Sequence, residues 1–101
     1  MYGLKDSEIE TMNSFFSEID NLEKVVLYGS RAKGNYKRFS DVDITLTGDH
    51  LTLNDLYKLQ DLFYYSDLPY MYDISIFKNI TNPDLADHIN RRGIVLWTRE
   101  R

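Results

Sequence analysis

The sequence contains no cysteine, which excludes disulfide bonds and zinc sites built on thiolates. It also has no apolar run long enough to span a bilayer, and its first residues lack the apolar segment of a signal peptide. Acidic residues outnumber basic ones by 16 to 12, whereas non-specific nucleic-acid binding usually requires a basic surface. These absences favour a cytoplasmic protein without membrane or direct nucleic-acid contacts, whose metal chemistry would rely on oxygen or imidazole ligands.

Helical and strand patterns alternate along the chain, and its 101 residues fit one domain covering residues 1–101. Apolar residues at helical spacing predict a first helix from Ser7, as N-cap with Glu10 three residues on, to Asp20. A second helix would begin after Thr52 or Asn54 and end near Ser66, and a third would cover residues 83–92. Short β-type runs predict strands over residues 24–28, 42–47 and 72–77, and the apolar residues 94–97 predict either a strand or an extended segment packed on the core. The alternation predicts an α/β domain.

Two aspartates stand one residue apart at the start of the second predicted strand, in Ser40-Asp41-Val42-Asp43-Ile44. The period of two places Asp41 and Asp43 on one face of the strand and the aliphatic residues on the other. Neighbouring carboxylates resist simultaneous ionisation unless a cation binds between them, and Mg²⁺ prefers such oxygen ligands. Asp73, on the third strand, would join them if the two strands are neighbours, as two-metal phosphoryl transfer requires.

A glycine-serine pair ends the first predicted strand, in Tyr28-Gly29-Ser30-Arg31-Ala32-Lys33-Gly34. Gly29 would let the backbone approach a ligand closely, and the following short helix would present free amides to an anion. The Ser30 hydroxyl would donate to a phosphate oxygen, and Arg31 and Lys33 would neutralise further phosphate charge.

Simpler interpretations exist for most of these residues. Asp41 and Asp43 would be solvated acids on an exposed strand if Gly29-Ser30 and Asp73 did not accompany them. Lys37 and Arg38 are better explained as a solvated basic loop, and His50 and His88 as surface residues without partners at ligand spacing. The tyrosines at positions 64, 65, 70 and 72 are divided between core and a partner interface, which the sequence does not separate.

Together, Gly29-Ser30-Arg31-Ala32-Lys33-Gly34 and Ser40-Asp41-Val42-Asp43-Ile44 resemble the signature of the DNA polymerase β-like nucleotidyltransferase superfamily, and more narrowly its minimal nucleotidyltransferase (MNT) branch. The Asp73 strand and the closing residues 92–96 also fit. The resemblance implies a mixed sheet with helices mainly on one side, and nucleotidyl transfer from ATP to a hydroxyl. It further implies two Mg²⁺ ions on the three aspartates and triphosphate binding at Gly29 and Ser30.

The resemblance also implies a partner. Members of this branch typically act with an all-helical protein of the HEPN type, as antitoxins that attach AMP to a tyrosine of the HEPN toxin. A hetero- or homo-oligomer would follow from such pairing. Two alternatives stay open: a non-catalytic module that binds the partner, and a nucleotidyltransferase acting on a small molecule such as an antibiotic.

Overall fold

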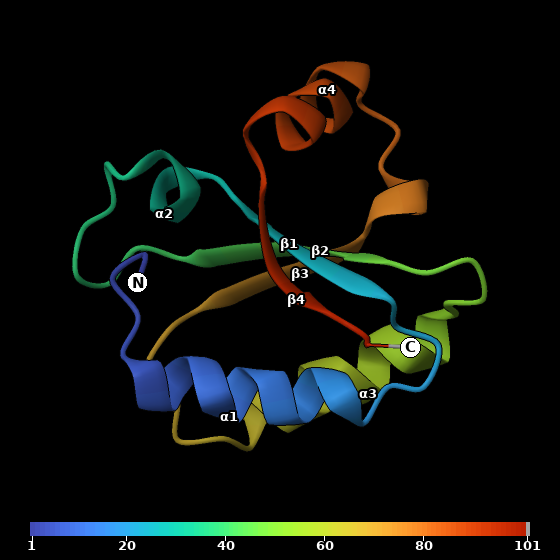
Figure 1. The fold of residues 1–101 in the computed structure, drawn as a ribbon, viewed down its shortest axis with the longest axis horizontal. Helices are drawn as coiled ribbons and strands as arrows, with labels where there is room; N and C mark the ends of the chain where they lie inside the picture. Colours follow the sequence, from blue (N-terminus) through green and yellow to red (C-terminus); the bar gives the residue numbers. More distant parts are fainter. Residues whose placement is uncertain (101) are drawn as a thin grey trace.

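A four-stranded sheet forms the centre of the computed structural model, which describes residues 1–100, and helices lie above and below it (Figure 1). The elements in chain order are α1 (Asp6–Ser17), β1 (Lys24–Tyr28), α2 (Ser30–Lys33), β2 (Val42–Thr47), α3 (Leu53–Tyr64), β3 (Tyr72–Ile76), the 3₁₀ turn η1 (Phe77–Asn79), α4 (Pro83–Arg92) and β4 (Ile94–Thr98). This order confirms the predicted α/β class.

The sheet is mixed, with strand order β3-β2-β1-β4. Strand β1 pairs antiparallel with both β2 and β4, whereas β2 and β3 are parallel. Parallel neighbours require a crossover connection, which α3 supplies between β2 and β3. The predicted segment 94–97 is therefore a true edge strand rather than only an extended segment.

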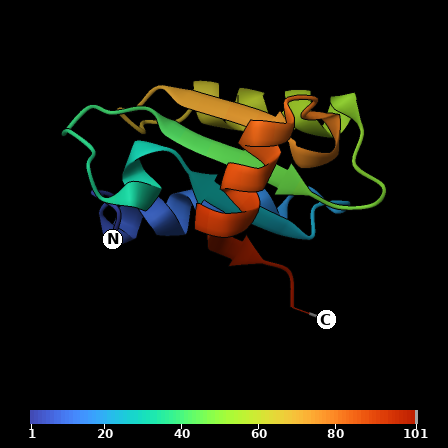
Figure 2. The same ribbon diagram turned by 90° about the horizontal axis from the view of Figure 1, so that it is seen from above.

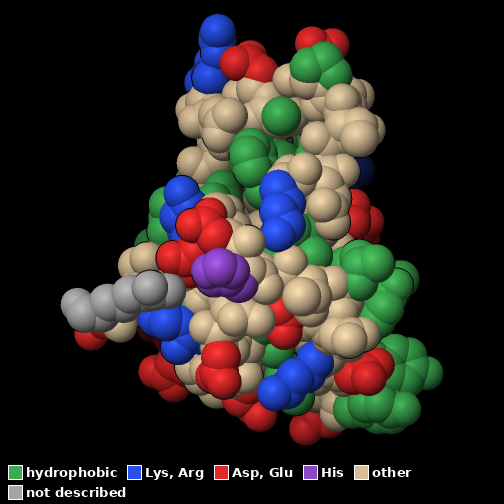
Figure 3. All heavy atoms as spheres, turned by 90° about the vertical axis from the view of Figure 1, so that its right-hand side faces the viewer, with side chains coloured by type: hydrophobic (Ala, Val, Ile, Leu, Met, Phe, Trp, Pro, Cys, Tyr) green, Lys and Arg blue, Asp and Glu red, His purple; other side chains and the backbone are tan. Residues whose placement is uncertain are grey.

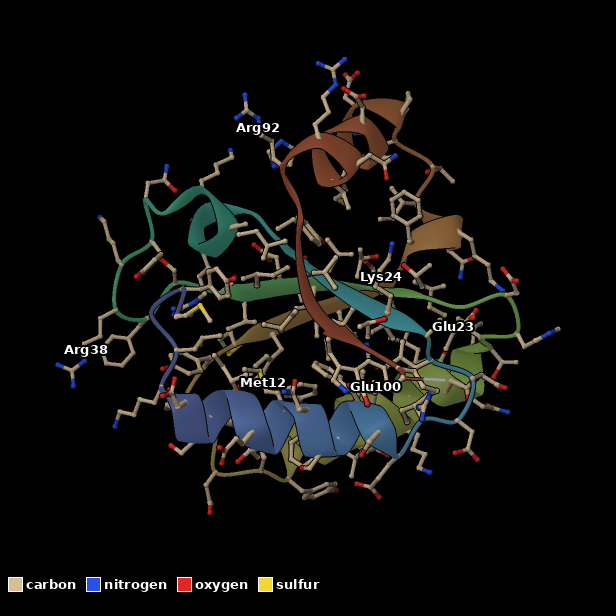
Figure 4. All side chains as sticks on the ribbon, viewed as in Figure 1. Met12, Glu23, Lys24, Arg38, Arg92 and Glu100 are labelled. Atoms are coloured by element: carbon tan, nitrogen blue, oxygen red, sulfur yellow. The ribbon has the colours of Figure 1, made fainter. Side chains whose placement is uncertain are left out.

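Helices α1 and α3 cover one face of the sheet and enclose the main core. Met12 projects from α1 toward the strands (Figure 4) and, like Phe16, is fully buried. Phe16 lies 6.0 Å from Phe63 of α3 and 5.9 Å from Trp97 of β4, measured between ring centroids. The aliphatic residues of β2 point into this core, as their alternation predicted: Val42, Ile44 and Leu46.

Helix α4 packs on the opposite face, above the strands in Figure 1 and in front of them in Figure 2. Ile89 is its buried anchor and contacts Val26 and Tyr28 of β1 in a second, smaller cluster. This single helix covers only part of its face, so the prediction of helices mainly on one side is confirmed.

The predicted start of the first helix was wrong in detail. Lys5, not Ser7, is the N-cap residue, and the Lys5 backbone N–H donates to Glu8 Oε1 at 2.8 Å. Glu8 is the acid three residues beyond this cap, so the acid that accepts from the cap N–H stands two residues earlier than the predicted Glu10. The helix also ends at Ser17, three residues before the predicted Asp20.

The predicted starts of the two later helices, α3 and α4, are confirmed. Thr52 caps α3 by accepting from the Asp55 N–H, and Asn82 caps α4 directly before Pro83. Within residues 1–100, no helix is long and apolar enough to cross a membrane.

Candidate active site

The turn between β1 and α2 brings backbone against the acidic strand β2. Gly29 has φ +76°, a left-handed conformation, and a Cβ atom built on it would overlap the Asp43 carboxylate. Both facts require glycine at this position. The turn then enters α2, where the Lys33 N–H donates to the Gly29 carbonyl at 3.1 Å, and Gly34 (φ +86°) ends the helix.

Two of the three predicted aspartates lie side by side on neighbouring strands. Asp43 of β2 stands directly opposite Asp73 of β3, and Tyr28 of β1 stands opposite Asp43 on its other side. Residues in register share a face, so these three side chains form a row across the sheet. Asp41 immediately precedes β2, two residues before Asp43. The row lies on the α4 side of the sheet, away from the main core.

The electrostatics of this row are unfavourable without a cation. Burial raises the pKa of Asp43 above its usual value, and the carboxylates of Asp73 and Asp41 raise it further. Asp43 is half-buried while Asp41 and Asp73 are exposed, so the three acids differ in environment but act on one another. Such a group of like charges is what a bound cation would relieve.

Hydroxyl groups lie beside the acidic row. The Ser75 hydroxyl donates to Thr45 Oγ1 at 3.0 Å, and Thr45 is fully buried. Burial raises the pKa of Tyr28, the nearby Asp73 and Asp43 raise it further, and a hydrogen bond with the Ser75 side chain opposes them. Tyr28 therefore connects β1 to β3 beside the acids.

The donor set is chemically suited to Mg²⁺, which accepts hard carboxylate oxygens and commonly uses one or two of them with water and substrate phosphates. The Asp43 carboxylate lies directly against the Gly29 backbone, so the turn and the acid that would share a ligand adjoin each other. Among residues 1–100, however, no three carboxylate or imidazole side chains are gathered into a ready-made metal site. The residues fit a metal that is completed by substrate oxygens rather than one held by protein alone.

Arg31 occupies a different position from the one its predicted phosphate role requires. Its side chain is only 1% exposed, and its guanidinium donates to the carbonyls of Ser40 (2.8 Å) and Tyr2 (3.0 Å). It also lies over the rings of Tyr36 and Tyr70, at 5.4 and 4.7 Å from their centroids. Arg31 therefore holds the N-terminus and the loop before β2 together, and its charge is not presented to a ligand.

The remaining cations separate into two groups. Lys33 is exposed on α2 and lines a cleft shared with α4. Arg38 lies far out on the loop (Figure 4), exposed and 5.3 Å above the Phe39 ring, consistent with a solvated loop. On the opposite side of the molecule, which Figure 3 shows, the acidic and basic side chains of residues 1–100 are interspersed.

With this geometry established, the comparisons define the class of protein. The family model for polymerase β nucleotidyltransferases matches residues 10–101, nearly the whole chain. The chain belongs to this family. A comparison with curated protein sequences finds no significant match.

Solved structures agree on the fold. A crystal structure of a toxin-antitoxin with AMP-PNP superposes with a TM-score of 0.71 at 21% identity, over 91% of this chain and 74% of that one. A candidate nucleotidyltransferase from Sulfolobus solfataricus superposes with a TM-score of 0.56 at 22% identity, over 92% of this chain and 82% of that one. At these identities the likeness establishes the nucleotidyltransferase fold.

Sequence reasoning missed Tyr28, Ser75 and the α4 side of the cleft. Tyr28 directly precedes Gly29, and its position at the end of a strand was the available signal. His88 was interpreted as a surface residue, yet it is half-buried and lines the cleft with Lys33. No local pattern in the sequence indicated that His88 and Lys33 line one cleft.

Proposed function

We propose that this protein is a magnesium-dependent nucleotidyltransferase that transfers AMP from ATP to a hydroxyl group of a partner protein. The observation that carries the proposal is the placement of Asp43 opposite Asp73, against the Gly29 turn. Family membership supplies the reaction class, and the geometry supplies a place where carboxylates and backbone meet.

In this proposal each residue has a task. Asp41, Asp43 and Asp73 would hold Mg²⁺, which when bound neutralises triphosphate charge and orients the reacting oxygens. The backbone N–H groups at Gly29 and Ser30, with the Ser30 hydroxyl, would bind the phosphates, and Lys33 would add a positive charge. Arg31 is assigned a structural task instead.

The transfer itself needs one proton acceptor. Asp73 would accept the proton of the acceptor hydroxyl as its oxygen forms a bond to the α-phosphorus of ATP. The bond from that phosphorus to the bridging oxygen of the β-phosphate breaks, and pyrophosphate leaves. Asp73 is exposed at the sheet edge strand, where an incoming hydroxyl would have access to it.

The acceptor we propose is a tyrosine hydroxyl of a HEPN-type toxin, so that the protein acts as its antitoxin. Two considerations support this: the resemblance to the minimal branch, and a structural relative described as a toxin-antitoxin with AMP-PNP. The chain is similar in fold to that protein, and exposed aromatic residues offer a partner surface.

The test is to incubate the protein and the product of its neighbouring gene with α-labelled ATP and Mg²⁺. Label should appear on the partner with wild-type protein and with Asp67→Asn, an exposed acid in the loop before β3, but not with Asp43→Asn. Equal labelling by Asp43→Asn would refute the proposal.

A non-catalytic binding module is the second candidate, favoured by one observation. Tyr64 and Tyr65 are 79% and 81% exposed and stacked edge to face, and Met71 nearby in the chain is 74% exposed. If the partner is neutralised by binding alone, Asp41→Ala/Asp43→Ala protein should still protect cells. Loss of protection with retained partner binding would exclude this candidate.

A further inference from the structure

A cleft of about 700 Å³ opens between α2 and α4 and is lined almost entirely by basic side chains. Lys33 comes from α2, and His88, Arg91 and Arg92 come from α4, together with the apolar Ala32 of α2. Figure 4 shows Arg92 on the side of α4 that faces α2. The whole chain carries a net charge of −4, so this local excess of positive charge is not a reflection of composition.

The sheet places this cleft next to the acidic row. Leu27, near the end of β1, pairs with Ile94 at the start of β4, so the end of α4 and the start of α2 lie at the same end of this strand pair. Tyr28, the next residue of β1, stands opposite Asp43. The cleft, the Gly29 turn and Asp43 therefore adjoin one another.

The cations of the cleft are not neutralised by the protein alone. Arg91 forms an ion pair with Asp87, with Nε 3.1 Å from Oδ1. Within the part of the chain that the structure describes, no hydrogen bond or ion pair forms at the head groups of Lys33 and Arg92. Basic residues in the last turn of a helix are stabilised by the helix dipole, which accounts for Arg91 and Arg92 at the end of α4. The dipole of α4 does not explain why Lys33 of the facing helix lines the same cleft.

Like charges around one cavity repel each other and concentrate counter-ions there. A ligand with several negative charges in a row would satisfy them at once, and guanidinium groups bind phosphates with particular strength. We infer that this cleft binds the β- and γ-phosphates of the nucleoside triphosphate, with Arg92 and His88 of α4 as binding residues beside Lys33. The inference rests on the proposed function and adds α4 to its site.

The experiment compares three ligands in the presence of Mg²⁺: a non-hydrolysable ATP analogue, AMP, and inorganic tripolyphosphate. Calorimetry on the 101-residue chain would give each dissociation constant. Arg92→Gln and the double variant His88→Asn/Arg92→Gln remove the proposed contacts, and Arg38→Gln is the matched control because Arg38 lies far from the cleft. Arg92 is exposed, so the fold should survive, which the midpoint of thermal unfolding checks.

Wild-type protein should bind the analogue more tightly than AMP, and tripolyphosphate should compete with the analogue. Arg92→Gln should weaken analogue binding about tenfold, as expected for one lost charge-assisted hydrogen bond, and the double variant should weaken it further. AMP binding should change less than about twofold, Arg92→Lys should recover part of the loss, and Arg38→Gln should have no effect.

Unchanged analogue binding by the double variant would overturn the inference while leaving the proposed function intact. An equal loss for AMP and the analogue would also overturn it, because the cleft would then not hold the phosphate tail. If the wild-type chain binds no nucleotide at all, the proposed function and this inference both fail.

Discussion

Replacing Asp43 with asparagine should stabilise the protein in the absence of metal while abolishing nucleotidyl transfer. Asp43 is half-buried and faces Asp73 across the β2–β3 pair, with Asp41 close by. Burial and these two carboxylates raise the pKa of Asp43, so the folded state holds its proton more tightly than the unfolded state. Ionising Asp43 therefore costs folding free energy, and asparagine, a neutral side chain of the same shape, avoids that cost.

The size of the effect follows from the register. Like charges directly opposite on neighbouring strands destabilise a sheet by about 0.5–1 kcal/mol, on the scale measured for cross-strand pairs. For a domain of this size, 1 kcal/mol shifts the unfolding midpoint by about 4–8 °C. Asp43→Asn should thus unfold roughly 2–8 °C above the wild type at neutral pH with a chelator present.

The sign of this stability difference can also be tested by its dependence on pH. Because the folded-state pKa is raised, the penalty is absent well below the usual value of 3.8, grows as the pH rises through the folded-state pKa, and is complete above it. The difference in midpoint between Asp43→Asn and wild type should shrink as the pH is lowered toward 4. Asp67→Asn, which removes an exposed loop acid, should show no such difference.

Thermal unfolding followed by circular dichroism, with a chelator and then with Mg²⁺ and an ATP analogue, measures these effects. Ligand should raise the midpoint of the wild type and leave Asp43→Asn unchanged, because ligand binding stabilises only a protein with an intact site. A midpoint for Asp43→Asn at or below that of the wild type, in the chelator, would refute the electrostatic reasoning.

Four further substitutions distinguish residues of the site from residues of the fold. Gly29→Ala should abolish nucleotide binding and lower the free energy of unfolding by more than the ~1–2 kcal/mol of left-handed backbone strain. Gly34→Ala, which has no atom near its Cβ, should cost only that strain and keep nucleotide binding. Calorimetry would measure the binding, and denaturant unfolding the stability. Arg31→Met should destabilise the fold by about 3 kcal/mol in denaturant unfolding, since the Ser40 carbonyl loses its donor. Phe16→Ala should cost about 3–5 kcal/mol in the same assay by leaving a cavity in the main core.

The sequence predicted most of the elements because their signals are local. The alternation in Val42–Thr47 indicated which side chains enter the main core, although it did not indicate that Thr45 is buried on the other face, and Asn82-Pro83 marked the start of α4. The register of Asp43 with Asp73 was not predictable in the same way. Two strands separated by a helix become neighbours only through packing of the whole sheet. From the sequence, Asp73 could therefore be expected to join Asp43 only if their strands were neighbours.

Arg31 shows where local reasoning about the site fails. A cation one residue after Gly29-Ser30 is placed by spacing to contact phosphate, yet the carbonyls of Tyr2 and Ser40 hold it inside. These partners lie 29 and 9 residues away in the chain, so no window around Arg31 contains the reason. His88 was missed for the same cause, because its proximity to Lys33 depends on how β4 pairs with β1.

The two faces of the sheet thus differ in function, one stabilising the fold and the other carrying the candidate site. The face under α1 and α3 is apolar and closely packed, so substitutions there should change stability without altering ligand preference. The face toward α4 carries repelling carboxylates and a glycine held in a left-handed conformation, features that weaken the free fold. Such features persist where a ligand offsets them, and Asp43 should therefore be the position at which stability and ligand binding change in opposite directions.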